Sequence, residues 1–493
     1  MIDLACLTLT DLNQKAAAKF RNRLAFAVYR EGHTYNRITY REWGIRARQF
    51  GGLLRTLGLH PGDRVMILAE NRPEWPVAYF GVALGGLVSV PVLPDCSPEQ
   101  IKAIGDHAGI AALCITEKTY PKIAPAGIDP AIPLIYLDKN TEIDHKQGRA
   151  VTDILVSVHC RKKTVPLWQG DRFGEPENWF PEIREEDLAS IWYSSGTTGH
   201  GKGVMLSHRN LLFTAQASCA LMKIFPRDRI LSMIPLAHTY ECILGLLTTV
   251  LSGASVTYLD RPPTQAVLLS AIQALRPTIM VTPLFFIENI YRHRIAPALM
   301  ANPLYTFPLT RFLAVKIAGH TLMAALGSSI RFLGIGGASL SPELERFLRK
   351  VQFPYAPGYG LTETSILVAG TGPYRFPLGS AGKPIKGVEL RLCPLSSEKV
   401  PGTPSGYTQG EIQVRGPNVM LGYYRDPEAT KEAFTPDAWL KTGDVGFLDQ
   451  KGYLFIRGRI KATILGSSGE QGLFSASNPT EDVLVYPGEQ VGH

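Results

Sequence analysis

The sequence contains few cysteines, and they are not clustered. Seven cysteines are spread over 493 residues, their number is odd, and none form a C-x-x-C pair. This spacing excludes a disulfide-rich scaffold and suggests no zinc site. It is typical of a protein in a reducing compartment.

Long runs of one charge, internal repeats and low-complexity tracts are also lacking. The net charge is +8, but the lysines and arginines are spread thinly along the chain. A basic surface of this kind suits phosphate-rich ligands or anionic lipid in general and selects no partner by itself. We expect no nucleic-acid partner.

The sequence shows no signal-peptide pattern and no continuous membrane-spanning run. Residues 75–94 are uncharged and long enough to cross a bilayer, but Gly85, Gly86 and Pro91 interrupt them. We therefore predict a buried helix, a glycine break and a buried strand. Acidic residues near the N-terminus do not fit a signal peptide, and we expect a cytoplasmic protein.

Helix-like and strand-like segments alternate through most of the chain. A helix is predicted to begin near Thr39, and residues 63–69, 88–93 and 111–116 have the pattern of strands. Strand-like segments recur at 190–193, 254–259, 278–282 and 331–335. Such alternation predicts βαβ units with a largely parallel sheet.

These patterns predict an α/β fold with four parts. Two doubly wound α/β subdomains are expected over residues 1–187 and 188–378, with a polar surface connection at 140–180. Short strands with Gly/Pro turns predict a small β-barrel over 379–458. Residues 459–493 are expected to form a hinge and a vestigial C-terminal domain.

The strongest local feature is YSSGTTGHGKGV, residues 193–204, which follows a strand-like segment. Its glycines let the backbone approach a polyphosphate, its hydroxyls and amides donate to phosphate oxygens, and Lys202 supplies positive charge. A Walker A loop would need Ser or Thr after Lys202, where Gly203 stands, and a helix starting there. We instead predict a loop between two strands, with the next helix capped by Ser207.

This loop resembles the phosphate loop of the adenylate-forming superfamily, and further motifs follow in that family's order. They are PLAHTYE (235–241), GGASLS (336–341), GYGLTE (358–363), GEIQVRG (410–416), WLKTGD (439–444) and RGRIK (457–461). The resemblance covers residues 38–461. It implies two α/β subdomains, a β-barrel and a small mobile C-terminal domain. The implied reaction joins a carboxylate to AMP from ATP, releases pyrophosphate, and then passes the acyl group to a thiol.

The resemblance also implies individual roles. His238 would lie beside the acyl carboxylate, Thr362 would contact the α-phosphate, and Glu363 would hold Mg²⁺. Lys202 would be a fourth catalytic residue beside His238, Thr362 and Glu363, and Lys461 would be the hinge. The implied nucleotide-binding residues are Ser194, Ser195, Gly196, Thr197, Thr198, Gly199, Gly337, Ala338, Gly358, Tyr359, Asp444 and Arg459. The sequence departs from the family at Gly201, where proline is usual.

The region expected to bind the acid is apolar. Its predicted acyl-binding residues are Tyr240, Thr282, Phe285 and Gly336. No aspartate lies within 235–244 to pair with the α-amino group of an amino acid. Residues 283–291 resemble the long-chain fatty acid–CoA ligase branch. The implied substrate is a medium- or long-chain fatty acid, with ATP, Mg²⁺ and coenzyme A.

Two alternatives remain open for the activity. The chain could be a catalytically incomplete homologue that binds nucleotide or acyl chains, or a ligase that passes its acyl group to a carrier protein. Residues 462–493 contain no Lys or Arg, whereas the family's C-terminal domain carries a lysine that contacts the α-phosphate. We therefore expect slow acyl-CoA synthesis unless a separate C-terminal domain is supplied.

One segment has a biased charge. Residues 289–342 contain no acidic residue but include Arg292, Arg294, Arg311, Lys316 and Arg331. The stretch 308–317 is helix-like, with apolar and basic positions. Two readings remain open: a surface resting on anionic lipid at the inner membrane face, or a core helix with a solvated basic edge.

Overall fold

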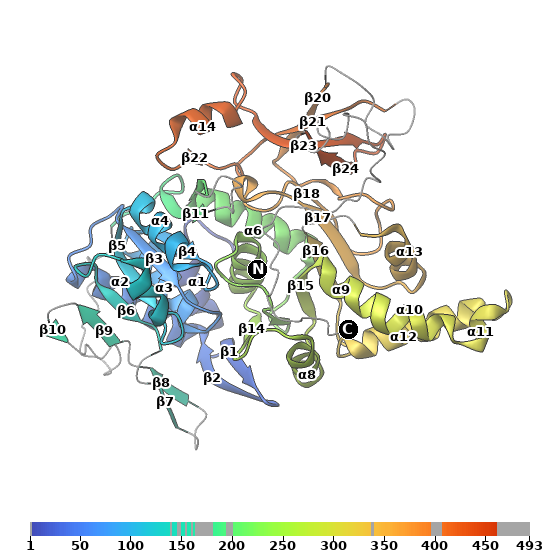
Figure 1. Cartoon of the computed structure of the whole chain (residues 1–493), viewed down its shortest axis with the longest axis horizontal. Helices are drawn as coiled ribbons and strands as arrows, with labels where there is room; N and C mark the ends of the chain where they lie inside the picture. Colours follow the sequence, from blue (N-terminus) through green and yellow to red (C-terminus); the bar gives the residue numbers. More distant parts are fainter. Residues whose placement is uncertain are drawn as a thin grey trace.

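The computed structural model describes residues 2–138, 181–193, 201–336, 340–395 and 407–460, together with the backbone of four short strands between residues 141 and 162. Two large sheets lie side by side, and a small antiparallel sheet lies across one end of them (Figure 1). The mixed α/β fold predicted from the sequence is confirmed.

The first large sheet has the spatial order β10-β9-β6-β5-β3-β4-β11-β12-β22. Its central strands β6, β5, β3, β4 and β11 are parallel, and antiparallel strands extend it at both edges. The strands are β3 (Arg64–Leu68), β4 (Val88–Val92), β5 (Ile110–Ile115), β6 (Leu134–Tyr136), β9 (Leu155–Val158), β10 (Arg161–Lys162), β11 (Leu188–Tyr193), β12 (Gly203–Ser207) and β22 (Gly422–Tyr423).

The second large sheet has the order β19-β18-β17-β16-β15-β13-β14-β1-β2. The six strands from β17 to β1 run parallel. The strands are β1 (Leu24–Arg30), β2 (His33–Thr39), β13 (Arg229–Leu231), β14 (Ser255–Leu259), β15 (Ile279–Pro283), β16 (Phe332–Gly336), β17 (Tyr355–Tyr359), β18 (Ala369–Gly370) and β19 (Lys383–Pro384).

Each of the two large sheets includes strands from both halves of the sequence. Strands β1 and β2, from the start of the chain, join the second sheet, whereas β11 and β12 close one side of the first sheet. The boundary at residue 187 therefore does not coincide with a division between sheets. The polar stretch 140–180, expected to be a connection, contributes β9 and β10 to the first sheet and a separate ribbon of β7 (Thr141–Asp144) with β8 (Arg149–Thr152).

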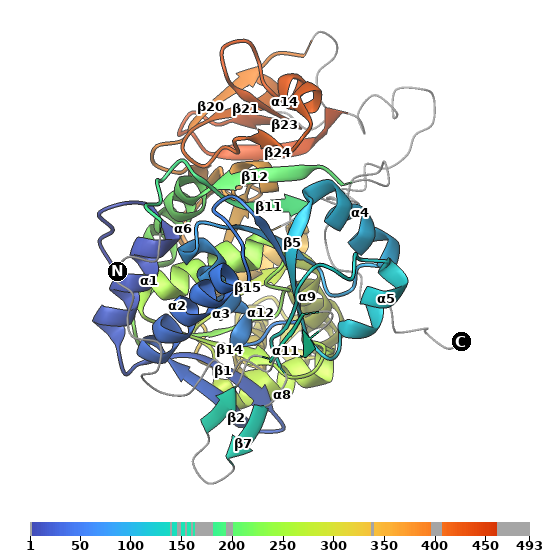
Figure 2. The ribbon, with the colours of Figure 1, turned by 90° about the vertical axis from the view of Figure 1, so that its left-hand side faces the viewer.

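Hydrophobic clusters lie on both faces of each large sheet. Side chains along β3 alternate, with Val65 and Ile67 in the cluster between the sheets and Met66 and Leu68 in the cluster on the outer face. The inner cluster includes residues of α1 (Leu9–Phe20), α2 (Tyr40–Thr56), α3 (Glu74–Leu84), α6 (His208–Met222) and α7 (Thr248–Ser252). This period-two alternation gives helix and sheet layers that stack in turn, as Figure 2 shows from the side.

Local sequence signals account for several helices. Thr39 and Glu42 form a capping box at the start of α2, and Ser207 caps α6 directly after β12. These caps satisfy backbone N–H groups that the first helical turn leaves unpaired. The uncharged run 75–94 forms the fully buried helix α3, the break at Gly85-Gly86 and the fully buried strand β4, as predicted.

The small sheet near the C-terminus is open. It has the antiparallel order β20-β21-β23-β24, with β20 (Glu389–Cys393), β21 (Gln409–Arg415), β23 (Leu440–Leu448) and β24 (Leu454–Arg459). The predicted closed β-barrel is wrong for the residues that the structure describes, because four strands do not curl far enough to close. The vestigial domain predicted beyond this sheet lies outside the described residues.

The remaining helices cover the outer faces. α4 (Pro98–Ala108) and α5 (Ile123–Ala126) flank the first sheet, and α8 (Gln265–Leu275) and α13 (Pro342–Lys350) flank the second. A further group projects away from the second sheet (Figure 1): α9 (Leu284–Ile290), the π-helical turn η3 (Tyr291–Ile295), α10 (Ala296–Met300), α11 (Pro303–Thr306) and α12 (Arg311–Ala325). Within the described ranges, no helix is both long and apolar enough to span a membrane.

The contact between α2 and α3 depends on a glycine, which allows a direct test. A Cβ atom at Gly81 would lie 2.8 Å from the Ala47 carbonyl oxygen and 2.8 Å from Phe50, whereas one at Gly52 would meet nothing within 4 Å. We predict that Gly81→Ala lowers the thermal midpoint and costs roughly 1–3 kcal/mol. The matched change Gly52→Ala should be neutral or stabilising, because alanine is the better helix former. Equal midpoints for the two variants would contradict this packing.

Candidate active site

The strand order of the second sheet places a switch point, where a binding crevice is expected, at the carboxyl end of β13. The chain leaves β13 for β14 on one side and returns to β15 on the other side. Ligands of open α/β sheets bind at such a switch point, where the two connections diverge. The PLAHTYE motif follows β13, and Thr282 and Pro283 end β15, so both predicted acyl-site segments flank this crevice.

His238 is oriented by the backbone that follows it. Its Nδ1 accepts a hydrogen bond from the Tyr240 N–H at 3.1 Å, so the proton of a neutral ring lies on Nε2. The neighbouring Thr239 is buried, and its hydroxyl lies 3.5 Å from that of Thr362. The structure thus brings the His238 segment and the Thr362 segment together.

Three of the four predicted acyl-binding residues lie together at the strand ends. A Cβ at Gly336 would be 2.7 Å from the Tyr240 ring, so the ring occupies the space that a side chain would need. Thr282 pairs in register with the residue before Gly336, and its buried hydroxyl has no hydrogen-bond partner among the described residues. Phe285, on the first turn of α9, is 40% exposed, so its ring is less enclosed than the other three.

Glu241 is fully buried at the start of the π-helical turn η2 (Glu241–Leu247). Burial raises the pKa of this carboxyl to about 8, although Ser232 and the backbone of Ile234 act in the opposite direction. Near pH 7 the group is therefore mostly uncharged. A protonated carboxyl provides no counter-ion for an amino group and does not repel a carboxylate.

A tight turn carries Thr362 and Glu363. After the 3-10 turn η4 (Thr362–Thr364), Ser365 has a φ of 47° and Ile366 a φ of 69°. A positive φ is especially unusual for Ile366, because its side chain is β-branched. The chain folds back so closely that a Cβ at Gly360 would lie 2.1 Å from the Ile366 carbonyl oxygen. Strain of this kind persists where the surrounding structure holds it, often at functional sites.

Tyr359 and Asp444 join the second sheet to the small sheet. The Tyr359 hydroxyl donates to Asp444 Oδ2 at 2.7 Å, and Arg459 Nε donates to Asp444 Oδ1 at 2.9 Å. Burial raises the pKa of Asp444 despite the attraction of Arg459, and burial together with Asp444 raises the pKa of Tyr359 well above its ordinary value. The structure therefore brings three predicted nucleotide-binding residues into one network, with Gly358 next to Tyr359 on β17.

Tyr423, on β22, connects two predicted site residues. Its hydroxyl donates to Glu363 Oε1 at 3.0 Å, and Lys202 Nζ lies 4.7 Å from the centroid of its ring. Burial and the Glu363 carboxylate both raise the pKa of Tyr423. The ring thus lies between the carboxylate and the lysine. Sequence reasoning missed Tyr423, because its partners are 60 and more residues away and no motif marks it.

Asn71 also went unrecognised in the sequence, although it holds the loop that leads to His238. Its Nδ2 donates to the Ser232 hydroxyl at 3.0 Å and to the Ile234 carbonyl at 2.6 Å, and its Oδ1 accepts from the Leu236 N–H at 2.6 Å. Asn71 follows β3, where the connections of the first sheet diverge toward β4 and β5. The switch-point rule applied to that strand end would have identified it.

Several predicted residues lie outside the described residues. They are Ser194, Ser195, Gly196, Thr197, Thr198, Gly199, Gly337, Ala338 and Lys461. The flanks of the phosphate loop are described: β11 ends at Tyr193 and pairs antiparallel with β12, which starts at Gly203. The strands predicted on either side of residues 194–200 are therefore confirmed, and these residues themselves lie outside the described ones.

The second sheet is an open α/β sheet with an imidazole, hydroxyls and a carboxylate near its switch point, which is where ligands of such sheets are expected to bind. A family model described as "AMP-binding enzyme" matches residues 13–424. The chain belongs to this family of AMP-binding enzymes.

The chain is also similar to individual members of known function. It is 31% identical over 460 residues to long chain acyl-CoA synthetase 6, peroxisomal, of Arabidopsis thaliana, covering 88% of this chain and 63% of the plant protein. It is 28% identical over 512 aligned positions to the long-chain-fatty-acid–CoA ligase of Escherichia coli O157:H7, covering 98% and 82% of the two chains. The solved structure of ATP-bound MatB from Rhodopseudomonas palustris shares the fold, with a TM-score of 0.69, 24% identity and coverage of 92% and 79%.

The Asn71 contacts can be tested by a nearly isosteric substitution. Asn71→Asp keeps an acceptor for the Leu236 N–H, but it removes both donated hydrogen bonds and places negative charge against the Ile234 carbonyl. We expect it to lower the thermal midpoint, with a cost of roughly 1–3 kcal/mol. The same change at Asn22, which is exposed, should stay within about 0.5 kcal/mol of the parent. An Asn71→Asp midpoint equal to that of Asn22→Asp would refute the role of Asn71.

Proposed function

We propose that this chain uses ATP to activate a medium- or long-chain fatty acid, first as acyl-AMP and then as acyl-CoA. The observation that carries this proposal is the meeting, at one crevice, of the His238 segment, the Thr362–Glu363 turn and the Tyr359–Asp444 pair. The residues come from three separate stretches of the sequence, near 238, 359–363 and 444, and from two different sheets. The names of the Arabidopsis and Escherichia coli relatives support a fatty acid as substrate.

We assign the acid to the side of the crevice formed by β13, β15 and β16. His238 Nε2–H and the Thr282 hydroxyl are suitable donors for its carboxylate. The Tyr240 ring and the glycine at 336 would flank the acyl chain, with Phe285 farther out on α9. The uncharged state of Glu241 fits a carboxylate ligand, because it adds no repulsion near pH 7.

We assign the nucleotide to the opposite side. Tyr359 would lie against the adenine ring, with Gly337, Ala338 and Gly358 beside it. Asp444 would accept from the ribose hydroxyls, since Tyr359 and Arg459 already orient both of its oxygens. Thr362 would contact the α-phosphate. Lys202 and the hydroxyl-rich loop from Ser194 to Gly199 would bind the outer phosphates.

Glu363 fits a magnesium ligand. Mg²⁺ usually takes one or two protein carboxylates together with substrate phosphate oxygens. Tyr423 donates to one oxygen of Glu363 and thereby orients the carboxylate, while Lys202 lies over the face of the tyrosine ring. When bound, the ion would neutralise charge on the phosphates during transfer.

The proposed reaction has two displacements. An oxygen of the fatty acid carboxylate attacks the α-phosphorus, and the bond to pyrophosphate breaks. A thiolate then attacks the acyl carbonyl, and AMP leaves. The residues on both sides of the crevice would contribute by holding the two reactants in line and by stabilising negative charge.

The acceptor and the location are finer parts of the proposal. We propose coenzyme A as the acceptor, with a carrier protein as the alternative and Lys461 as the hinge for a C-terminal domain in the same or a separate chain. We place the reaction in the cytoplasm at the inner membrane surface. The wide cysteine spacing fits a reducing compartment.

The first test is pyrophosphate release. We expect the purified chain to release pyrophosphate from ATP only when both Mg²⁺ and a fatty acid are present. A matched fatty alcohol should give no release, because it lacks the carboxylate that attacks the phosphorus. Release that is independent of the acid, or ADP as the product, would rule out the proposed reaction. Comparing coenzyme A with an acyl carrier protein as the trigger of AMP release then identifies the acceptor.

The second test concerns the metal. Glu363→Gln keeps the oxygen that accepts from Tyr423 but removes the negative charge, so we expect magnesium–ATP to bind roughly tenfold more weakly or worse. Glu432→Gln, at an exposed position of α14 (Pro427–Ala433), is the matched control and should bind like the parent. Calorimetric titration with magnesium–ATP measures both. Parent-like affinity in Glu363→Gln would show that the metal assignment is wrong.

A further inference from the structure

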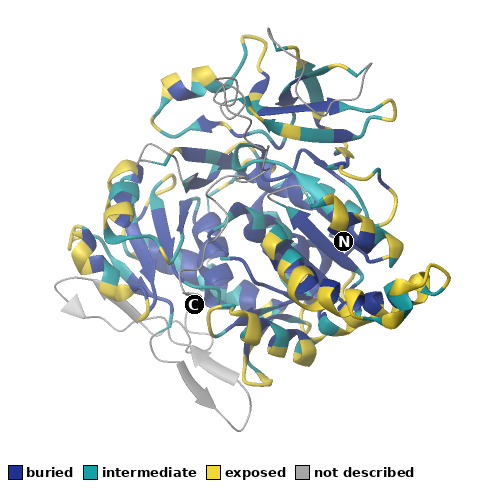
Figure 3. Cartoon of the chain, turned by 45° about the vertical axis from the view of Figure 1, so that its right-hand side comes forward, coloured by how far each residue is buried: buried dark blue, intermediate teal, exposed yellow. Residues whose placement is uncertain are grey.

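The projecting helices carry a concentration of exposed apolar side chains. Twelve large hydrophobic residues are exposed in the described part of the chain, and six of them lie between residues 300 and 317. We call these six the apolar tip: Met300, Phe307, Leu309, Phe312, Leu313 and Ile317. Leu309 is 89% exposed and Phe312 is 72% exposed, so these side chains do not pack into the core. Figure 3 shows many exposed residues along this projection.

Helix α12 has apolar side chains both on its buried face and on its exposed surface. Ala314, Ala318 and Leu322, spaced four apart, are buried against the rest of the second subdomain. Phe312, Leu313 and Ile317 are exposed on the remaining surface of the helix, together with the basic Lys316. Exposed large apolar side chains that gather in one place mark a surface that binds a membrane or another protein.

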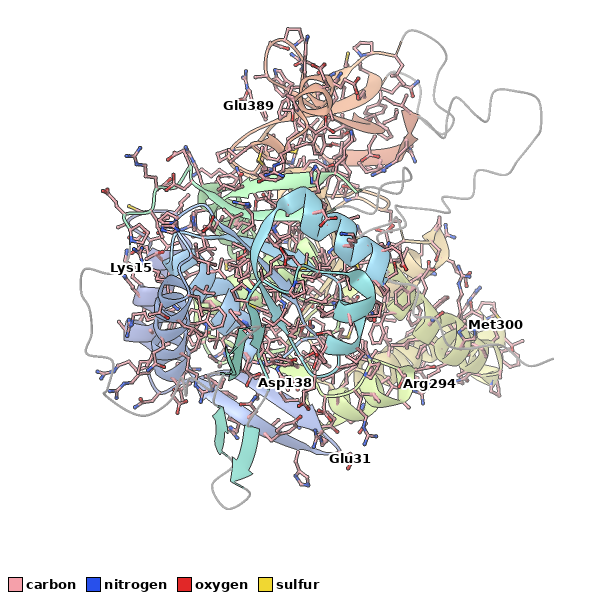
Figure 4. The ribbon with its side chains drawn as sticks, turned by 60° about the vertical axis from the view of Figure 1, so that its left-hand side comes forward. Lys15, Glu31, Asp138, Arg294, Met300 and Glu389 are labelled. Atoms are coloured by element: carbon pink, nitrogen blue, oxygen red, sulfur yellow. The ribbon has the colours of Figure 1, made fainter. Side chains whose placement is uncertain are left out.

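Every charged residue between 289 and 342 is basic. Arg294, Arg311 and Lys316 are exposed, and residues 289–342 contain no acidic residue. Arg292 pairs with Glu288 at 3.6 Å, and Arg311 stacks on Tyr305 at 4.4 Å. Arg294 and Met300 lie on the same projection, away from the sheets (Figure 4). Basic groups thus surround the exposed apolar side chains.

We propose that the apolar tip inserts into the interfacial layer of an anionic lipid bilayer, with Arg294, Arg311 and Lys316 at the level of the headgroups. Apolar residues flanked by lysine and arginine bind such surfaces through burial of apolar area and through attraction to anionic lipid. A second copy of the chain fits less well. A two-fold contact through this surface would bring the basic groups of residues 289–342 of both copies together.

The apolar tip is connected to the crevice through one helical segment. α9 begins directly after Pro283 at the end of β15, and η3 and α10 continue it to Met300. A bilayer bound at the tip would therefore lie at the far end of the helix whose first turn carries Phe285. Delivery of a fatty acid from the bilayer rests on the proposed function, whereas lipid binding itself does not.

Co-sedimentation of the whole chain with vesicles tests the proposal. The vesicles are phosphatidylcholine alone or phosphatidylcholine with 30% phosphatidylglycerol, a composition chosen as roughly that of a strongly anionic surface. Leu309→Ser with Phe312→Ser removes apolar area, and Arg294→Gln with Lys316→Gln removes charge. The matched controls are Tyr374→Ser with Leu421→Ser, which are exposed apolar residues elsewhere, and Lys431→Gln with Lys451→Gln. Circular dichroism and thermal midpoints confirm that each variant is folded.

We expect tighter binding to the anionic vesicles, with roughly fivefold weaker partitioning for each charge removed. The serine pair at the tip should lower binding at least tenfold, and both control pairs should bind like the parent. Equal binding to neutral and anionic vesicles, or unchanged binding in both tip variants, would overturn the proposal. So would a tip variant that changes the sedimentation coefficient of the protein but not its lipid binding, since that result indicates a contact between copies.

A second readout separates this proposal from the proposed function. In the tip variants, pyrophosphate release with a short, water-soluble fatty acid should match the parent, and release with a vesicle-embedded acid should fall in parallel with lipid binding. Lipid binding without any pyrophosphate release in the parent would uphold the membrane surface and reject the activity. Pyrophosphate release without lipid binding would uphold the activity and reject the membrane surface.

Discussion

The hydrogen bonds between Asn71 and the loop from Ser232 to Leu236 connect the first large sheet to the second. This loop leaves the second sheet at its switch point, after the Ser232 N–H has donated a last hydrogen bond to Thr257 on β14. One side-chain amide from the first sheet binds a hydroxyl, a carbonyl and an N–H of the loop. Because PLAHTYE follows immediately, the direction of His238 depends on how the two sheets meet.

The candidate site is therefore assembled from three sheets. The first sheet supplies Asn71 and, on β22, Tyr423; the second supplies His238, Thr282 and Tyr359; the small sheet supplies Asp444. Each junction is made by a tyrosine or amide that bonds across it, such as Tyr359 with Asp444 at 2.7 Å. A shift of the small sheet would move Asp444 away from Tyr359, so the position of that sheet and the geometry of the nucleotide side are coupled. Closure of such a site around ligands is a common way to exclude water from a transfer reaction.

Local patterns predicted the local elements well. The helix start near Thr39, the Ser207 cap and the helix–glycine–strand prediction for residues 75–94 were all correct, because each depends on neighbours within a few residues. The pairing of strands was harder. β1 joins β14 across more than 220 residues, and no composition signal marks such a contact. The barrel prediction failed for a related reason, since strand periodicity does not say whether a sheet closes.

Within the site, the ordered motifs found residues that contact one another, including Tyr359 with Asp444 and Arg459. They did not find Asn71 or Tyr423, whose partners lie on other sheets. The sequence predicted the exposed surface of α12 only in part. Its basic bias could be read directly from the residues. The exposure of Phe312 could not, because it follows from the burial of Ala314 and Ala318 against the rest of the protein.

The central claim is that a fatty acid carboxylate attacks the α-phosphorus of ATP at this crevice, and oxygen isotope transfer tests it most directly. A fatty acid labelled with ¹⁸O in both carboxylate oxygens is incubated with the chain, ATP and Mg²⁺, and any acyl-AMP is cleaved at its carbonyl by hydroxide. The account predicts AMP that carries one ¹⁸O atom, because the attacking oxygen stays on phosphorus. Label in inorganic phosphate, or AMP without label despite acid-dependent turnover, would contradict it.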